Sequence, residues 1–159
     1  MALIHEFTTA KQADIQKILE NVNLLRDASV VSPVVGIHDD FILYFADSMK
    51  WIETTNPRKK PEEHIPHQSL CYYGLTLFLP NQVTQFKRVI EAWYSMFSLA
   101  PDEFIITGSW TEVVGEENSG KYDKIKAIKA EILETLSELI QLCVDVEKDD
   151  SLCLFHWGI

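Results

Sequence analysis

An uncharged stretch over residues 69–79, SLCYYGLTLFL, stands out in the pattern of hydrophobic and polar positions along the chain. Its alternate positions form two faces that are both largely apolar, which is typical of a strand covered on both sides. The sequence therefore predicts a central strand over residues 69–79, with the remaining elements arranged around it.

The pattern before this stretch predicts a helix followed by a hairpin. Thr9 and Gln12 have the spacing of a capping box, and apolar residues then recur at helical spacing. The segments 34–38 and 41–45 are short apolar runs on either side of two aspartates, which is typical of a tight hairpin. We therefore expect a helix over residues 9–28 and an antiparallel pair of strands after it.

The remaining segments show loop, helix and strand patterns in turn. Residues 56–67 are rich in proline and charge, so we expect a long exposed loop there. Apolar residues at helical spacing predict helices over residues 80–100 and 121–147, and period-two alternation predicts a strand over residues 104–114. An apolar segment predicts a last strand over residues 152–157.

The order of these elements predicts the α+β class, with a mixed, mainly antiparallel sheet and about three helices packed mainly on one face. The strand, helix, strand, helix, strand order after residue 69 leaves the α/β class as the alternative. The chain has 159 residues, of which 47% are hydrophobic. This is enough for one core, so we expect a single globular domain over residues 1–159.

The net charge and the composition limit the kinds of partner and the cellular location that we expect. A net charge of −10 and a pI near 4.9 disfavour binding to nucleic acid or to anionic membranes, both of which attract lysine and arginine. No apolar run approaches the ~20 residues of a membrane helix, and the N-terminus lacks a basic region followed by an apolar stretch. The three cysteines form no CxxC pair and lie in apolar patterns. We therefore expect a cytoplasmic protein with buried thiols.

The sequence contains no motif that indicates catalysis or cofactor binding. It has no GxSxG elbow, no GxxxxGK[ST] loop and no GxGxxG loop, so we expect no catalytic residue and no cofactor. The HDD cluster at residues 38–40 is explained by a turn between two apolar runs. In the 56–67 loop, His64 and His67 have the HxxH spacing that supplies two metal ligands. A metal-dependent hydrolase that uses His64 and His67 is therefore the enzymatic alternative.

Five carboxylates share one face of the predicted long helix and its end, opposite the apolar stripe. These residues, which we call the acidic ridge, are Glu131, Glu134, Glu138, Asp145 and Asp149. On a wheel of about 100° per residue they fall within about 60° of one another. Lysines occupy the N-terminal half of the same predicted helix, which is the reverse of the order that the helix dipole favours. Helix stability alone does not select this arrangement.

Together these features favour a protein that binds another protein. A small acidic α+β domain without a catalytic motif has the size and charge of bacterial immunity and antitoxin proteins. We therefore expect a non-enzymatic module whose acidic ridge binds a basic protein, most concretely an inhibitor that masks a toxin such as a nuclease. Glu116 and Glu117, in the loop before the predicted helix, are expected rim contacts. A structural subunit that assembles with copies of itself is the third interpretation.

Overall fold

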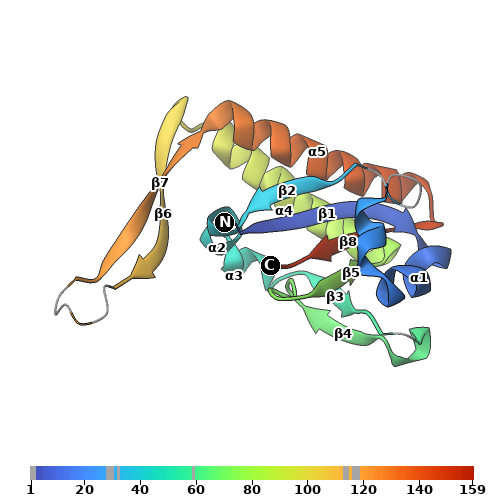
Figure 1. Ribbon diagram of the computed structural model, residues 1–159. Coiled ribbons are helices and arrows are strands. Elements are labelled where there is room, and N and C mark those ends of the chain that lie inside the picture. Colours follow the sequence, from blue (N-terminus) through green and yellow to red (C-terminus); the bar gives the residue numbers. More distant parts are fainter. Residues whose placement is uncertain (1–2, 28–30, 32, 59, 113–114, 116–118) are drawn as a thin grey trace.

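The computed structural model describes residues 3–27, 31, 33–58, 60–112, 115 and 119–159. Its largest sheet has six strands: β1 (Ile4–Lys11), β2 (Val35–His38), β3 (Glu53–Asn56), β4 (Ile65–Gln68), β5 (Leu75–Phe78) and β8 (Leu152–Trp157). They lie in the order β2-β1-β8-β5-β3-β4, and every recorded pairing is antiparallel. The strand β8 therefore lies near the middle of the sheet, between β1 and β5 (Figure 1).

Two further strands form a separate antiparallel hairpin. They are β6 (Glu103–Thr111) and β7 (Lys121–Ile128). The far end of the hairpin extends well away from the six-stranded sheet (Figure 1). At its near end, Ile106 and Ala127 are buried in the main core. The hairpin is thus anchored at one end and exposed at the other.

Helices cover the two faces of the sheet unequally. The helices are α1 (Ile15–Glu20), α2 (Asp39–Tyr44), α3 (Ala46–Met49), α4 (Pro80–Ser98) and α5 (Lys129–Lys148), with 3₁₀ turns η1 (Gln12–Asp14), η2 (Val22–Arg26) and η3 (Pro61–Glu63). The long helices α4 and α5 lie side by side on one face, where they meet Phe7, Phe78 and Leu154 in the main core (Figure 1). On the other face, Ile18 of α1 joins Leu77 and Phe155 in a smaller core. The fold is α+β, as the element order predicts.

The predictions for α4, β6 and β8 agree with the structure. The predicted helix over residues 80–100 is Pro80–Ser98, and the predicted last strand is Leu152–Trp157. The predicted strand over residues 104–114 is Glu103–Thr111, and residues 113–114 lie outside the described part of the chain. Each of these elements has a clear local period of apolar residues.

The central strand predicted over residues 69–79 is shorter than expected. Only Leu75–Phe78 forms β5. In the segment before it, the backbone N–H of Cys71 donates to Thr76 Oγ1 (2.7 Å), and the N–H of Gly74 donates to the Cys71 carbonyl (3.4 Å). These two bonds form turns, and the carbonyls of Tyr72 and Gly74 accept the N–H groups of Ile159 and Gly158, so the segment is held beside the end of β8 without forming a regular strand.

The helix predicted over residues 9–28 is wrong in its first part. Residues Ile4–Lys11 form β1, which pairs with β2 on one side and β8 on the other. Thr9 is therefore a buried strand residue and not a helix cap, and helical structure begins only at Gln12. Strand pairing on both sides of β1 outweighs the local capping-box pattern, since tertiary contacts override a weak helix propensity.

The predicted hairpin after residue 34 is correct only in its first strand. The strand β2 forms at Val35–His38, but the expected return strand is the helix α2. The His38 ring accepts the backbone N–H of Asp40 at the start of α2 (3.3 Å), and Asp39 and Asp40 lie in its first turn. The helix dipole favours negative charge at this end. The two aspartates therefore begin a helix instead of closing a turn.

The predicted loop over residues 56–67 contains most of a strand. Ile65–Gln68 forms β4, which pairs with β3 at the edge of the sheet and is exposed along its whole length. Pro66 is compatible with this position because an edge strand leaves one row of its backbone groups unpaired.

The helix predicted over residues 121–147 begins later than expected. The first eight residues form the strand β7, and α5 starts at Lys129. Ile125 and Ala127 alternate with two lysines in β7, and this period of two fits a strand. The lysines expected on the helix therefore lie on β7 or at the first residue of α5. The predicted reversal of charge along the helix dipole does not exist.

Candidate functional site

The first half of the acidic ridge is an open row of carboxylates on α5. Glu131, Glu134 and Glu138 are exposed, on the side of α5 away from its buried apolar stripe. Among the described residues, none of these three side chains has an ion-pair or hydrogen-bond partner. Glu116 and Glu117, the expected rim contacts, lie outside the described residues. The ridge thus presents three unpaired negative charges on consecutive turns.

The second half of the acidic ridge is already engaged within the chain. Asp145 accepts a hydrogen bond from the Gln141 side-chain amide (2.8 Å). Asp149 lies just after the last residue of α5 and accepts the backbone N–H of Ser151 (2.9 Å). Hydrogen bonding by the Ser151 side chain, and then by its backbone N–H, lowers the pKa of Asp149. These two residues are therefore less available to a partner than the three glutamates.

Glu147, another carboxylate of α5, has a structural role. Glu147 pairs with Lys87 of α4 and accepts a hydrogen bond from Thr84 (2.8 Å). The hydrogen bond from Lys87 is the main cause of the lowered pKa of Glu147. Glu147 holds α5 against α4, whereas the three open glutamates form no ion pair or side-chain hydrogen bond with another element in the described chain.

Two adjoining hollows open beside the first turn of α5, and we call them together the α5 hollow. Their volumes are about 180 and 240 Å³. Both are lined by His38, Phe41, Glu131 and Ile132. The rest of the lining is mostly apolar and comes from β2, α2, β6, β7 and α5. The acidic ridge therefore begins at the mouth of an apolar depression.

One other charged group of the α5 hollow is paired, since Lys126 Nζ lies 2.8 Å from Glu103 Oε2 across the hairpin. Asp40 Oδ2 lies 3.3 Å from His38 Nδ1, but this nitrogen accepts the backbone N–H of Asp40 and has no proton to donate to the carboxylate. Among the described residues, the Glu131 side chain has no partner, and Asp40 adds a second carboxylate that His38 does not compensate. The electrostatic preference of the α5 hollow is therefore for a cation.

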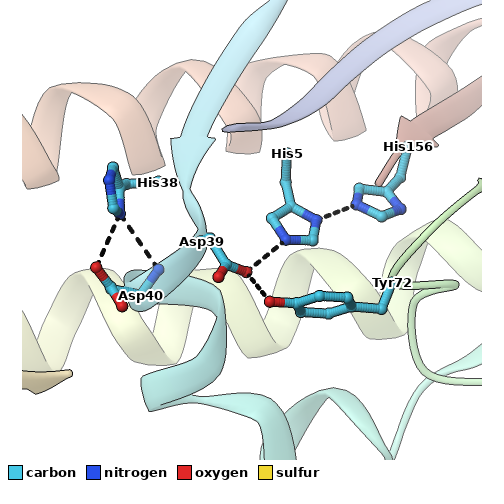
Figure 2. Close-up of polar contacts among 6 residues, drawn as sticks. All are labelled: His5, His38, Asp39, Asp40, Tyr72 and His156. Carbon is cyan, nitrogen blue, oxygen red and sulfur yellow. Dashed lines mark hydrogen bonds and ion pairs between the residues drawn. The ribbon is translucent and has the colours of Figure 1, made fainter. Parts of the chain in front are cut away.

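A buried polar network lies elsewhere, on the sheet face that α4 and α5 cover (Figure 2). Tyr72 Oη donates to Asp39 Oδ1 (2.5 Å), and His5 Nε2 donates to the same oxygen (3.0 Å). His5 Nδ1 is then an acceptor, so His156 Nε2 donates to it (2.8 Å). His156 Nδ1 in turn accepts from Thr76 Oγ1 (3.2 Å). Every donor has an acceptor when both imidazoles are neutral and Asp39 carries the one negative charge.

Burial sets the protonation of this network. The side chains of His5 and His156 are fully buried, and Asp39 is 5% exposed. Burial lowers the pKa of His156 well below its usual value, and His5 lowers it further. Burial also lowers the pKa of His5, although Asp39 opposes this shift. Burial and then the bond to Asp39 raise the pKa of Tyr72.

The network has the parts of an acid–base relay, but most of its side chains are buried away from solvent. Of its five side chains, only Tyr72 is partly exposed. We therefore interpret it as a structural network that joins β1, β8, α2 and the segment before β5. Sequence reasoning missed it because its bonded partners lie up to 151 positions apart. The sequence feature that could have indicated the network is the presence of His5 and His156 within apolar segments.

The histidines of the predicted 56–67 loop are not brought together with further ligands. His64 Nδ1 accepts the backbone N–H of Arg58 (3.0 Å), and His67 lies on β4 opposite Thr54. Within the described ranges, no group of three or more His, Cys, Asp or Glu side chains has the arrangement of a metal site. Cys143 and Cys153 are buried as expected, whereas Cys71 is half-buried.

Comparison with protein-family models, with curated proteins and with solved structures gives no match for the chain. None of the described helices combines the length and the apolar character needed to cross a membrane. The placement of charges and hollows on the surface is therefore the guide to function.

Proposed function

We propose that the protein is a non-enzymatic binding module that recognises a basic protein through Glu131, Glu134 and Glu138. The observation that carries this proposal is the open half of the acidic ridge, three exposed carboxylates without partners in the described chain. Like charges one turn apart on a helix destabilise it by roughly 0.2–0.5 kcal/mol per pair. Lysine or arginine side chains of a partner relieve this repulsion, so the ridge is better suited to a complex than to the free protein.

The most concrete form of this proposal is an immunity or antitoxin-type inhibitor of a toxin such as a nuclease. A nuclease binds phosphates through a basic cleft, and an acidic surface placed over that cleft excludes the nucleic acid. The net charge of −10 adds long-range attraction and predicts fast association that weakens with salt. Asp145 and Asp149 would contribute at the far end of the ridge, with Glu116 and Glu117 at its rim.

The test begins with affinity capture from the native cells, elution by a salt step and identification of the eluate. The purified partner is then titrated by calorimetry against the double variant Glu134→Lys, Glu138→Lys. We expect at least a tenfold loss of affinity and a weaker dependence on salt, since both changes remove and reverse contacts of the ridge.

The matched control is Glu20→Lys, Glu62→Lys, which changes the net charge equally at two exposed positions off α5. An equal loss of affinity for the partner in both double variants would mean that binding depends only on the net charge of the protein. Unchanged affinity in the ridge variant would show that α5 is not the binding surface.

A second candidate, a subunit that assembles with copies of itself, is favoured by the outer end of the hairpin. Trp110 and Tyr122 face each other across β6 and β7, with ring centroids 4.9 Å apart, and both are more than half exposed. Exposed aromatic side chains of this kind are common at protein interfaces. Sedimentation over a range of concentrations, with Trp110→Ser as the comparison, distinguishes self-association from a monomer.

A further inference from the structure

We propose that the α5 hollow is an anchor site for one arginine side chain of the basic partner. The inference rests on the proposed function, because it assigns the place where a single side chain of that partner is held. The juxtaposition that carries it is an uncompensated carboxylate, Glu131, at the mouth of an apolar depression lined by Phe41 and Ile132.

Each part of the α5 hollow has room for a single side chain. The two parts measure about 180 and 240 Å³. Sites for small organic ligands and cofactors usually measure about 300–1,000 Å³, so each part taken singly is below this range. One side chain that enters from the surface suits either part.

The charges of the lining favour a cationic head group. Lys126 is neutralised by Glu103, whereas His38 Nδ1 accepts the backbone N–H of Asp40 and leaves the Asp40 carboxylate uncompensated. The carboxylate of Glu131 has no partner in the described chain. It belongs to an exposed residue that lines both parts of the hollow, so it can meet a cation without being buried itself.

Arginine fits this combination better than lysine does. A guanidinium is planar and offers two parallel donors to a carboxylate, and it stacks on aromatic rings, whereas an ammonium is a strongly hydrated point charge. Phe41 lines both parts of the hollow and supplies the ring. Ile132, which is half-buried, supplies apolar surface for the three methylene groups of the stem. Arginine anchors in such pockets are frequent hot spots of protein interfaces.

The test uses the full-length protein with labelled isoleucine and leucine methyl groups and no partner. The probe is N-acetyl-arginine amide, and its neutral, equally shaped counterpart is N-acetyl-citrulline amide. We expect saturable shifts of the Ile37, Ile132 and Leu136 methyl resonances with the arginine probe, with a dissociation constant in the millimolar range. The citrulline probe should bind at least about fivefold more weakly, because it lacks the charge-assisted contact with Glu131.

Glu131→Gln should reduce the preference for arginine over citrulline to within about twofold. Glu62→Gln is the matched control, since Glu62 is exposed in η3, lies outside the acidic ridge and lines neither part of the hollow, and it should keep the full preference. The inference is overturned by absence of saturable shifts, by equal binding of arginine and citrulline, or by tighter binding of N-acetyl-lysine amide. The partner is absent from this titration. A negative result combined with loss of affinity in the charge-reversed ridge therefore removes the anchor and keeps the proposed function.

Discussion

At the scale of single residues, Asp39 is the acceptor on which the buried polar network converges. One of its carboxylate oxygens accepts hydrogen bonds from Tyr72 and His5, which come from different parts of the chain. A buried charge is tolerated only while donors compensate it, and removal of one donor leaves a desolvation cost.

Tyr72→Phe should lower the free energy of unfolding by about 1–3 kcal/mol, because Asp39 loses its closest donor. Urea denaturation monitored by tryptophan fluorescence measures this change. The neighbouring Tyr73→Phe is the matched control, since Tyr73 is 81% exposed, and it should stay within about 0.5 kcal/mol of the wild type. Equal stability of the two variants would mean that the hydroxyl of Tyr72 does not support the buried charge.

Stability should fall as the pH is lowered from about 6.5 toward 5. The folded state holds the pKa of His5 and His156 below 6.5, so the unfolded state binds more protons in this range and is favoured by acid. Each histidine that stays neutral contributes a slope of up to about 1.4 kcal/mol per pH unit. Urea denaturation at several pH values measures the slope.

His156→Asn should flatten this pH dependence, whereas His67→Gln at an exposed position of β4 leaves the buried pair intact and should keep the slope. Carboxylates with a lowered pKa, such as Glu147, lose their contribution to the free energy of unfolding only as the pH falls below about 4.5. The slope between pH 6.5 and 5 therefore reports the histidines. An identical slope in the wild type and in the His156 variant would contradict the assignment of neutral, buried imidazoles.

At the scale of elements, the boundary between β7 and α5 decides which charges lie on the helix. Lys124 and Lys126 are in the hairpin, and Glu131 lies in the first turn of α5, where the helix dipole stabilises it. The acidic ridge is therefore compatible with a stable helix. The binding role that we propose for the ridge rests on the absence of partners for Glu131, Glu134 and Glu138 in the described chain and not on an unfavourable order of charge.

This boundary predicts opposite responses to the same substitutions on its two sides. At Lys124, opposite Thr107 in the hairpin, valine should be more stable than alanine by up to about 1 kcal/mol, since β-branched residues favour strands. At exposed Glu134 in α5, alanine should be more stable than valine by about half that amount. Thermal unfolding of the four variants measures both differences. The same preference at both positions would contradict the strand assignment of Lys121–Ile128.

At the scale of the whole molecule, one aromatic cluster ties the helical layer to the sheet. Phe86 of α4 is fully buried and packs against Phe7 of β1 and Phe78 of β5, with ring centroids 5.8 and 4.5 Å apart. The α5 hollow and the ridge depend on this layer, because α5 packs on α4.

Phe86→Ala should therefore destabilise the protein by about 3–5 kcal/mol, through lost burial and a cavity between the layers. Tyr94→Ala on the same helix is the control, since Tyr94 is 38% exposed, and its effect should be much smaller. Denaturant unfolding gives both values. A cost below about 1 kcal/mol for Phe86→Ala would mean that the layer is not held by this cluster.

The sequence by itself determined the elements whose burial follows a local period. The helix α4, the strands β6 and β8 and the apolar stripe of α5 were predicted because neighbouring residues carry the whole signal. The exposure of Glu131, Glu134 and Glu138 follows from the same stripe, since the face of a helix opposite its apolar residues points to water.

Only the tertiary structure decided the remaining strands and the surroundings of the site. The strands β1, β4 and β7 form because their backbones find partners on other strands, and sequence periods do not record such pairing. The α5 hollow combines residues of β2, α2, the hairpin and α5, and the buried network joins His5 to His156. These contacts depend on how distant segments pack, so no local pattern predicts them.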